Sequence, residues 1–204
     1  GVQVSLKKCD INQLVSDVHS QFTSPAELKG ISVMLDLPEG EIFASVDREK
    51  VCKIIVNLIG NAVKYAQSRI DIKLVSSDEG FRVSVSDDGP GIPDVEKRKV
   101  FEAFYQVKDG KSGAVGTGIG LAFSKSLAEA HHGTLSLEDS VYGGSSFVLT
   151  LPWGEEAVSE EPEVVIPDGR EAADEEQGTE LSGSKFTILL VEDNVDLLNL
   201  TRES

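Results

Sequence analysis

The sequence predicts an α/β (α+β) fold, a two-layer sandwich in which a mixed sheet packs against helices. Segments with strand-like alternation and segments with helical spacing follow one another in mixed order along residues 1–153. The last two strand segments have no helix between them, which predicts an antiparallel pair and argues against a doubly wound parallel sheet. With 40% hydrophobic and 26% charged residues, the composition is globular and excludes wholesale disorder.

The first third of the chain predicts three strands and a helix. Apolar residues alternate over residues 2–6, which favours a short strand. Asp10 stands before a helical pattern over residues 11–22 and can cap its amino end. Clean alternation over residues 31–37 and a shorter run over residues 42–46 predict two further strands.

The middle of the chain predicts a long helix followed by two strands. Asp47 can cap this helix, which we expect to reach about residue 66, because four apolar residues form one stripe: Val51, Ile55, Leu58 and Ala62. Alternation predicts strands over residues 70–74 and 81–85. The second of these strands runs into the turn sequence DDGPGIP, residues 87–93.

The last part of the body predicts two helices and the closing strand pair. A short helix is expected around residues 100–104, followed by a loop. Thr117 can cap a helix that reaches about His131, with Gly133 as its stop signal. Residues 135–137 and 147–151 alternate as strands.

Charge divides the chain into three parts. It carries 35 acidic and 19 basic side chains, a net charge of −16, which argues against nucleic-acid binding because a phosphate backbone would be repelled. Residues 154–184 hold eleven of the acids and a single base. We therefore expect a domain over residues 1–153, an acidic linker over 154–184, and a third segment over 185–204.

The two cysteines, Cys9 and Cys52, are expected to be free thiols, because they form no CxxC motif and no histidine stands at ligand spacing. No apolar run approaches the length of a membrane span, so we expect a cytoplasmic location. Met34 is the only methionine, which suggests a piece of a longer protein. Anchorage of that parent in the inner (plasma) membrane stays open.

The long helix carries a polar face. Asn57, Asn61 and Lys64 stand at i, i+4 and i+7, so they project from one side. An amide oxygen suits Mg²⁺, an ammonium group suits phosphate, and Tyr65 can lie along a base or a ribose. A solvent-facing stripe would show the same spacing, so this motif alone decides nothing.

A strand end and a glycine-rich turn add two further motifs. In DDGPGI (87–92), Gly89 and Gly91 permit a turn that leaves the Asp87 carboxylate fixed, able to accept from the amine of adenine. An ordinary Asp-Gly turn is the plain alternative. GTGIGL (116–121) leads into a helix and can bring phosphates to backbone N–H groups. It is not a Walker A loop, because no GKS or GKT follows. It also fails the dinucleotide fingerprint, because Leu121 stands where a third glycine is required.

In combination these motifs resemble a known family. NLIGNAVKY (57–65), DDGPGI (87–92), FEAF (101–104) and GTGIGL (116–121) occur in the order of the asparagine, first glycine, phenylalanine and second glycine boxes of the GHKL ATPases. They are most similar to the catalytic and ATP-binding domain of sensor histidine kinases. The resemblance covers residues 1–153 and implies the Bergerat fold, a mobile ATP lid, and ATP and Mg²⁺ as cofactors.

The resemblance also implies a role for each motif residue. Asn61 and Lys64 would be catalytic, with Asn57 assisting Asn61 at the metal. Asp87 would read adenine. Phe101 and Phe104 would anchor the lid, a role that is compatible with their being plain core aromatics. The remaining nucleotide contacts would come from Tyr65, Gly89, Gly91, Ile92, Gly116, Thr117, Gly118, Gly120 and Leu121, and from two lid lysines, Lys108 and Lys111.

One position separates the branches of this superfamily. The hydrolytic members resemble each other in placing a glutamate, the general base that activates water, four residues before the metal-binding asparagine. Here that position is Asn57, which favours a kinase. A GHKL-type ATP hydrolase and a non-catalytic nucleotide-binding scaffold remain the alternatives.

No histidine of this chain stands in the sequence context of a phosphoacceptor. His19, His131 and His132 are expected to be ordinary helix residues, the last two at a helix end. The resemblance implies that the acceptor lies on an upstream dimerisation domain of a homodimeric parent. Such a chain alone would not autophosphorylate.

The segment ILLVEDN (188–194) resembles the first strand of a response-regulator receiver domain. Glu192 and Asp193 would be its magnesium-binding acids, in a site that is incomplete because the acceptor aspartate would lie further on. A kinase domain, an acidic linker and a receiver start together imply a hybrid histidine kinase. Its receiver would take the phosphoryl group from the histidine.

Overall fold

The computed structural model describes residues 2–106 and 117–154. They belong to the first of two units into which the chain divides, Gly1–Ser159 and Glu160–Ser204. The predictions for the acidic linker and the receiver segment therefore lie outside the described residues. So do those for Lys108, Lys111, Gly116, Glu192 and Asp193.

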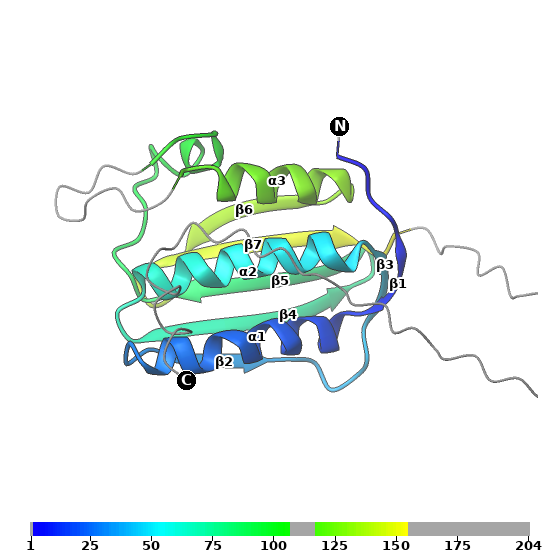
Figure 1. The fold of residues 1–204 in the computed structure, drawn as a ribbon, viewed down its shortest axis with the longest axis horizontal. Coiled ribbons are helices and arrows are strands. Elements are labelled where there is room, and N and C mark those ends of the chain that lie inside the picture. Colours follow the sequence, from blue (N-terminus) through cyan, green and yellow to red (C-terminus); the bar gives the residue numbers. More distant parts are fainter. Residues whose placement is uncertain (1, 107–116, 155–204) are drawn as a thin grey trace, which may run out of the picture. The chain divides into compact units, whose positions relative to one another are not determined.

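A five-stranded mixed sheet forms one layer of the domain (Figure 1). Its first edge strand runs parallel to its neighbour, and every other neighbouring pair is antiparallel. The strands lie in the order β2 (Ser32–Asp36), β4 (Arg69–Ser77), β5 (Gly80–Asp87), β7 (Ser145–Pro152) and β6 (Thr134–Asp139). The predicted closing pair is thus confirmed as β6 and β7.

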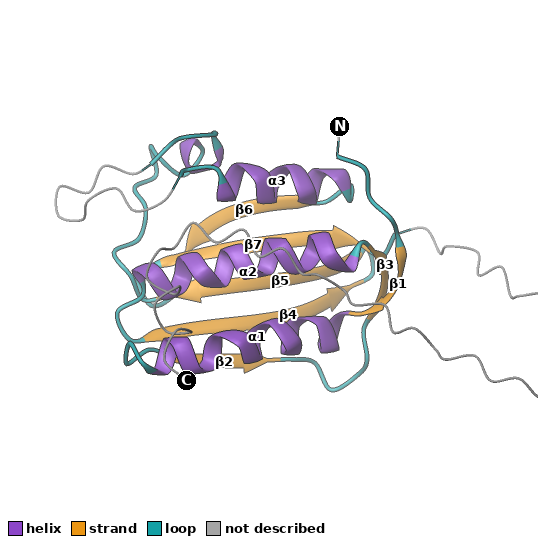
Figure 2. Ribbon diagram, in the orientation of Figure 1, coloured by secondary structure: helices purple, strands orange, loops and turns teal. Residues whose placement is uncertain are grey.

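Three helices form the second layer, on one face of this sheet (Figure 2). They are α1 (Ile11–Glu27), α2 (Arg48–Tyr65) and α3 (Gly120–Ala130). Their apolar faces meet the inward side chains of β4, β5 and β7 in one continuous core. The predicted two-layer α/β sandwich is confirmed.

A second, two-stranded sheet corrects the prediction for the amino terminus. β1 (Lys7–Asp10) pairs antiparallel with β3 (Phe43–Val46), whereas residues 2–6 form no strand. The buried residue of β1 is Cys9, opposite Ala44. The backbone N–H of Ser5 instead donates to Asp47 Oδ2 at 3.0 Å, so this stretch joins the start of α2.

Two of the three predicted helix starts are confirmed. Asp10 and Asp47 cap α1 and α2, since their side chains accept from the N–H groups of Gln13 and Lys50 at 3.0 and 3.2 Å. The helix α1 continues past residue 22 to Glu27, because its last turn places Ala26 fully in the core.

The prediction that Thr117 caps α3 is wrong. The N-cap residue is Ile119, and no side chain caps this helix end. At the other end His132, not Gly133, adopts the left-handed conformation, with φ +59°. Gly133 is required for another reason, because a Cβ there would overlap the Thr150 carbonyl oxygen of β7. The short helix expected around residues 100–104 is a single 3₁₀ turn, η1 (Lys99–Phe101).

Candidate functional site

The polar face of α2 is not a plain solvated stripe. Asn57 and Asn61 are half-buried, and only Lys64 is exposed. The Nδ2 group of Asn57 donates to the hydroxyl of Ser124 on α3 at 2.9 Å, and Ser124 itself is buried. The polar side chains of α2 therefore face α3 across the helical layer.

The first turn of α3 packs directly on Asn57. A Cβ at Gly120 would lie 2.5 Å from Asn57 Oδ1, so only glycine permits this approach. A hydrogen bond from Nδ2 to Ser124 thus fixes the side chain of Asn57, and its Oδ1 packs closely against Gly120. Two of the predicted motifs, from α2 and from GTGIGL, are brought together at this point.

Asp87 ends β5 and is buried, with 3% of its surface exposed. Its Oδ1 accepts from the N–H of Gly89 at 2.8 Å and from the N–H of Ser145 at 3.2 Å. Burial raises the pKa of this carboxyl. The two backbone N–H groups oppose the shift, and the neighbouring charge of Asp88 adds to it. Asp87 is therefore a fixed, poorly solvated acceptor.

Close backbone packing surrounds this carboxylate. A Cβ at Gly89 would lie 2.6 Å from the Tyr65 carbonyl oxygen, and one at Gly144 would overlap Asp87 Oδ1. Gly91 has φ +71°, as the predicted turn requires. The end of α2, the turn after β5 and the start of β7 therefore converge on Asp87.

Sequence reasoning missed three contributors to this site. Ser124 orients Asn57, while Gly144 and Ser145 pack on and bind Asp87. The Gly143–Gly144 pair was a readable turn signal. Nothing in the sequence marked Ser124, because its partner lies 67 residues away.

The phenylalanine motif splits into two different environments. Phe101 packs on the core, with its ring 6.3 Å from that of Phe147 in an edge-on arrangement. Phe104 is 75% exposed, so the interpretation of both as core aromatics is wrong. Its φ is +67°, and its N–H donates to the Gly118 carbonyl at 2.9 Å. This backbone bond joins the chain on the two sides of residues 107–116.

The remaining motif residues border the same region. The Lys64 ammonium lies 4.7 Å from the centre of the Tyr65 ring, on the exposed end of α2. Ile92 and Leu121 are partly buried against the core, while Thr117 is exposed. Ile92 and Leu121 thus contribute to the site through their packing against the core.

The donor set is compatible with a magnesium ion bound together with a polyphosphate. Among residues 2–106 and 117–154, no three His, Cys, Asp or Glu side chains cluster as a metal site. The half-buried Asn61 lies one turn beyond Asn57 on the same face of α2. One or two amide oxygens fit Mg²⁺, which takes few protein ligands and completes its shell with phosphate oxygens and water.

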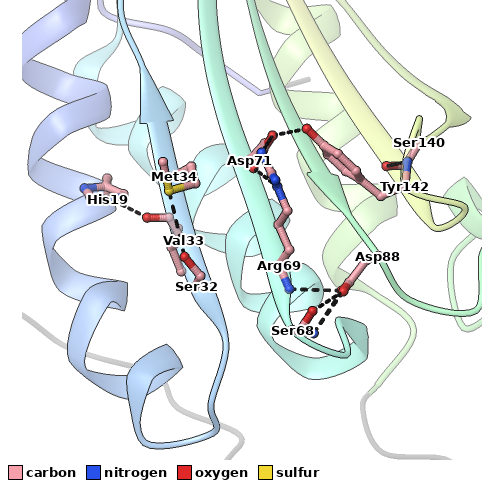
Figure 3. Close-up of polar contacts among 10 residues, drawn as sticks. All are labelled: His19, Ser32, Val33, Met34, Ser68, Arg69, Asp71, Asp88, Ser140 and Tyr142. Atoms are coloured by element: carbon pink, nitrogen blue, oxygen red, sulfur yellow. Dashed lines mark hydrogen bonds and ion pairs between the residues drawn. The ribbon is translucent and has the colours of Figure 1, made fainter.

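The histidines lie away from this site. His131 is buried, and its Nε2 accepts from the Asp47 N–H at 3.1 Å while its Nδ1 donates to the Leu127 carbonyl at 2.8 Å. His19 is half-buried, with Nε2 3.4 Å from the Val33 carbonyl oxygen (Figure 3), and His132 is exposed. His131 does stand at the end of α3, as predicted, and in addition it bridges α3 to the start of α2.

Comparison with known proteins assigns the family. A family model described as histidine kinase-, DNA gyrase B-, and HSP90-like ATPase matches residues 46–155, more than half of the chain. The chain belongs to this ATPase family. Within it, the domain is the ATP-binding catalytic domain of a sensor histidine kinase, as the named relatives indicate.

Two curated relatives and two solved structures illustrate this similarity. The chain is 32% identical to sensor histidine kinase TmoS of Ectopseudomonas mendocina over 98% of this chain and 22% of TmoS. It is 35% identical to hybrid signal transduction histidine kinase D of Dictyostelium discoideum over 70% of this chain and 10% of that protein. The chain thus spans less than a quarter of each.

The structural matches agree with the fold. Full-length ShkA in complex with AMPPNP matches 75% of this chain and 32% of its own, with a TM-score of 0.65 and 29% identity. The catalytic domain of histidine kinase ThkA matches 74% of this chain and 99% of its own, with a TM-score of 0.65 and 22% identity. Within the described part of this kinase domain, none of the helices combines the length and apolar character that a membrane crossing requires.

Proposed function

We propose that this domain binds Mg·ATP and donates the γ-phosphoryl group to a histidine on an upstream dimerisation domain of a hybrid histidine kinase. The observation that carries the proposal is the Asp87 carboxylate, buried at a strand end and held through Oδ1 alone by two backbone N–H groups. Its Oδ2 is left to accept from the exocyclic amine of adenine. Guanine would present a carbonyl oxygen there and be repelled.

The phosphates would lie between α2 and the start of α3. Lys64, on the exposed end of α2, would meet a phosphate oxygen as a point charge. The N–H groups before α3, at Gly118 and Gly120, would meet the others together with Gly116, Lys108 and Lys111. The Phe104–Gly118 bond would hold together the phenylalanine motif and the glycines that we propose as the hinge of the lid.

Asn61 would hold the metal through its amide oxygen, with Asn57 assisting. A bound Mg²⁺ would supply charge neutralisation at the phosphates. Asn57 is already engaged by Ser124, so Asn61 is the better ligand of the two. The side chains of this domain would then contribute position and charge, and no covalent chemistry.

In the transfer itself, the bond from the γ-phosphorus to the β,γ-bridging oxygen breaks. A bond to the unprotonated imidazole nitrogen of the acceptor forms, ADP leaves, and the other ring nitrogen releases its proton to solvent. Asn57 cannot act as a general base for water, which supports transfer over hydrolysis. The alternatives, an ATP hydrolase and a scaffold that does not transfer, are disfavoured by this residue and by the intact motifs.

The wider assignment concerns the parent protein. We expect a homodimer in the cytoplasm whose upstream helices carry the histidine, whether or not other segments of the parent anchor it in the inner membrane. Glu192 and Asp193 would begin a receiver in the same chain, to which the phosphoryl group is relayed. The similarity to the sensor histidine kinase TmoS extends over 98% of the chain and so beyond residue 154. Nucleic-acid binding is not expected.

Incubation with γ-labelled ATP tests the proposal. The isolated chain should bind ATP, stay unlabelled and release phosphate slowly, since a positioned base typically contributes about 10²–10⁴-fold. Adding the upstream dimerisation domain of the same protein should label its histidine, slowly because the tether is lost. Stable label on the isolated chain, or rapid phosphate release that an Asn57 substitution abolishes, would contradict it.

A further inference from the structure

The carboxylate of Asp88 binds three consecutive backbone N–H groups, those of Gln67 and Ser68 between α2 and β4 and that of Arg69 at the start of β4. Figure 3 shows the bonds to Ser68 and Arg69. Its Oδ1 accepts from Gln67 N at 2.8 Å and from Arg69 N at 3.1 Å. Its Oδ2 accepts from Ser68 N at 3.0 Å and from the Ser68 hydroxyl at 2.7 Å. One side chain thus accepts hydrogen bonds from three consecutive backbone N–H groups of a neighbouring segment.

The backbone of Asp88 completes this link in the other direction. Its N–H donates to the Arg69 carbonyl at 3.3 Å, and its carbonyl accepts from the side chain of Gln67 at 3.0 Å. Asp88 and residues 67–69 therefore hold each other through both main chain and side chain. No role in the site has so far been given to either.

The hydrogen bonds to Asp88 favour its ionised form and lower the pKa of its carboxyl. Burial opposes the charge, but the hydrogen bonds from Ser68, Arg69 and Gln67 outweigh it and hold the pKa of Asp88 well below its usual range. Each of these bonds is charge-assisted, and such bonds are stronger than neutral ones. The link is correspondingly firm.

The two linked segments carry the adenine end of the proposed site. Residues 67–69 follow Tyr65 at the end of α2, and Asp88 stands between Asp87 and Gly89. Across this junction a Cβ at Gly89 would lie 2.6 Å from the Tyr65 carbonyl oxygen. A small shift of one segment would therefore move Asp87 relative to α2.

A second set of contacts connects the same turn to the far side of Asp87. The Arg69 guanidinium pairs with Asp71 at 2.8 Å and lies 4.5 Å from the centre of the Tyr142 ring, and the Tyr142 hydroxyl donates to Asp71 (Figure 3). Tyr142 stands in the turn before Ser145, whose N–H binds Asp87. Residues 67–69, which Asp88 binds, thus contact both segments that fix the Asp87 carboxylate, namely the turn after β5 and the turn before Ser145.

We propose that Asp88 is a positioning residue, which holds the end of α2 against the turn after β5 and so sets the place of Asp87 for recognition of adenine. The proposal rests on the proposed function, because it takes Asp87 as the adenine acceptor. Asp88 itself would not touch the nucleotide, since its oxygens are occupied by residues 67–69.

The test measures ATP and GTP affinity of the full 204-residue chain by calorimetry, for Asp88→Ala and Asp88→Asn. Asp88→Ala should weaken ATP binding by about tenfold and lower the ratio of ATP to GTP affinity, because a displacement of about 1 Å can cost ~100-fold. Asp88→Asn should restore most of both. Its Oδ1 can still accept from the backbone, and its amide can donate to the Ser68 hydroxyl.

A matched control separates positioning from stability. Asp10→Ala removes a carboxylate that binds a backbone N–H at 3.0 Å in the same manner, but at the start of α1. It should lower the urea midpoint without changing the ratio of ATP to GTP affinity. An Asp88→Ala chain that behaves like Asp10→Ala, destabilised with its selectivity intact, would overturn the proposal.

Two further variants keep the outcome decisive. If Asp88→Ala does not fold, Ser68→Ala removes only the 2.7 Å bond to Oδ2 and should lower ATP affinity and selectivity by a smaller factor. Unchanged values in Ser68→Ala would then overturn the proposal. The Asp87→Asn variant separates a failure of the proposed function from a failure of the role given to Asp88. If Asp87→Asn also leaves adenine binding unchanged, the proposed function fails. If adenine binding is lost in Asp87→Asn alone, only the role of Asp88 is refuted.

Discussion

The Nδ2 group of Asn57 donates a hydrogen bond to the buried Ser124 hydroxyl at 2.9 Å, so this bond ties α2 to α3 at the position where we propose that a general base for water is lacking. The bond directs the amide of Asn57 toward α3, with Oδ1 against Gly120. A glutamate at position 57 would offer no donor to Ser124.

Ser124→Ala should lower the free energy of unfolding by about 1 kcal/mol, because the half-buried amide of Asn57 loses its acceptor. Urea denaturation measures the change. Ser126→Ala is the matched control, since Ser126 is exposed and its hydroxyl bonds only to the Ala122 carbonyl of its own helix. Equal midpoints for the two variants would show that the Asn57–Ser124 bond contributes nothing.

His131→Ala should destabilise the fold by about 1–3 kcal/mol, because it leaves the buried N–H of Asp47 without an acceptor at the start of α2. His132→Asn is the control: His132 is exposed, and asparagine tolerates its left-handed backbone. Thermal denaturation compares the two. A His131→Ala chain as stable as His132→Asn would mean that the bridge between α3 and α2 is dispensable.

Adenosine binding should weaken as the pH falls through the raised pKa of Asp87, above the ordinary aspartate value of about 4. Protonated Asp87 would present an O–H to the amine of adenine and lose its role as acceptor. Adenosine is the ligand of choice, since it has no phosphate that titrates. Asp87→Asn should lack this step; a wild-type profile without it, or the same step in the variant, would speak against the assignment.

The same pKa shift predicts a stability effect of opposite sign. Because the folded state raises the pKa of Asp87, protonation stabilises the fold at low pH, and this contribution is lost as the pH rises through the folded-state pKa. At neutral pH, without ligand, Asp87→Asn should therefore be at least as stable as the wild type in urea. A clearly lower midpoint would indicate that the charged form is favoured by contacts other than those with Gly89 and Ser145.

Asn61→Asp should impair phosphoryl transfer by about 100-fold, while ATP affinity changes less, because an added negative charge repels the phosphates and misplaces the γ group. The measurement is labelling of the upstream dimerisation domain supplied in trans. Gln21→Glu adds the same charge on the exposed face of α1 and should transfer normally. Normal transfer by Asn61→Asp would remove Asn61 from the metal site.

Local signals predicted most of the fold and part of the site. The caps at Asp10 and Asp47, the alternation in β4 and β5 and the turn after Asp87 all depend on neighbours in the chain, and the structure contains them. The GTGIGL motif predicted a helix in the right place, but not its cap.

The remainder depends on partners far away in the sequence. Ser5 and His131 bind the start of α2 across 42 and 84 residues, and Ser145 binds Asp87 across 58. No periodicity or spacing marks such pairs, because each requires the completed sheet and helical layer. The failure of the strand predicted over residues 2–6 has this cause: its amide at Ser5 is used by Asp47.

The most direct test of the account is calorimetric titration of ATP and GTP into the wild-type chain and the Asp87→Asn variant. The account predicts that the wild type prefers ATP. It also predicts that the variant, folded by circular dichroism, loses about 1.5–3 kcal/mol of ATP binding, roughly 10- to 150-fold in Kd, as expected for a charge-assisted hydrogen bond. Unchanged ATP affinity in a folded Asp87→Asn chain, or equal wild-type affinity for GTP, would contradict it.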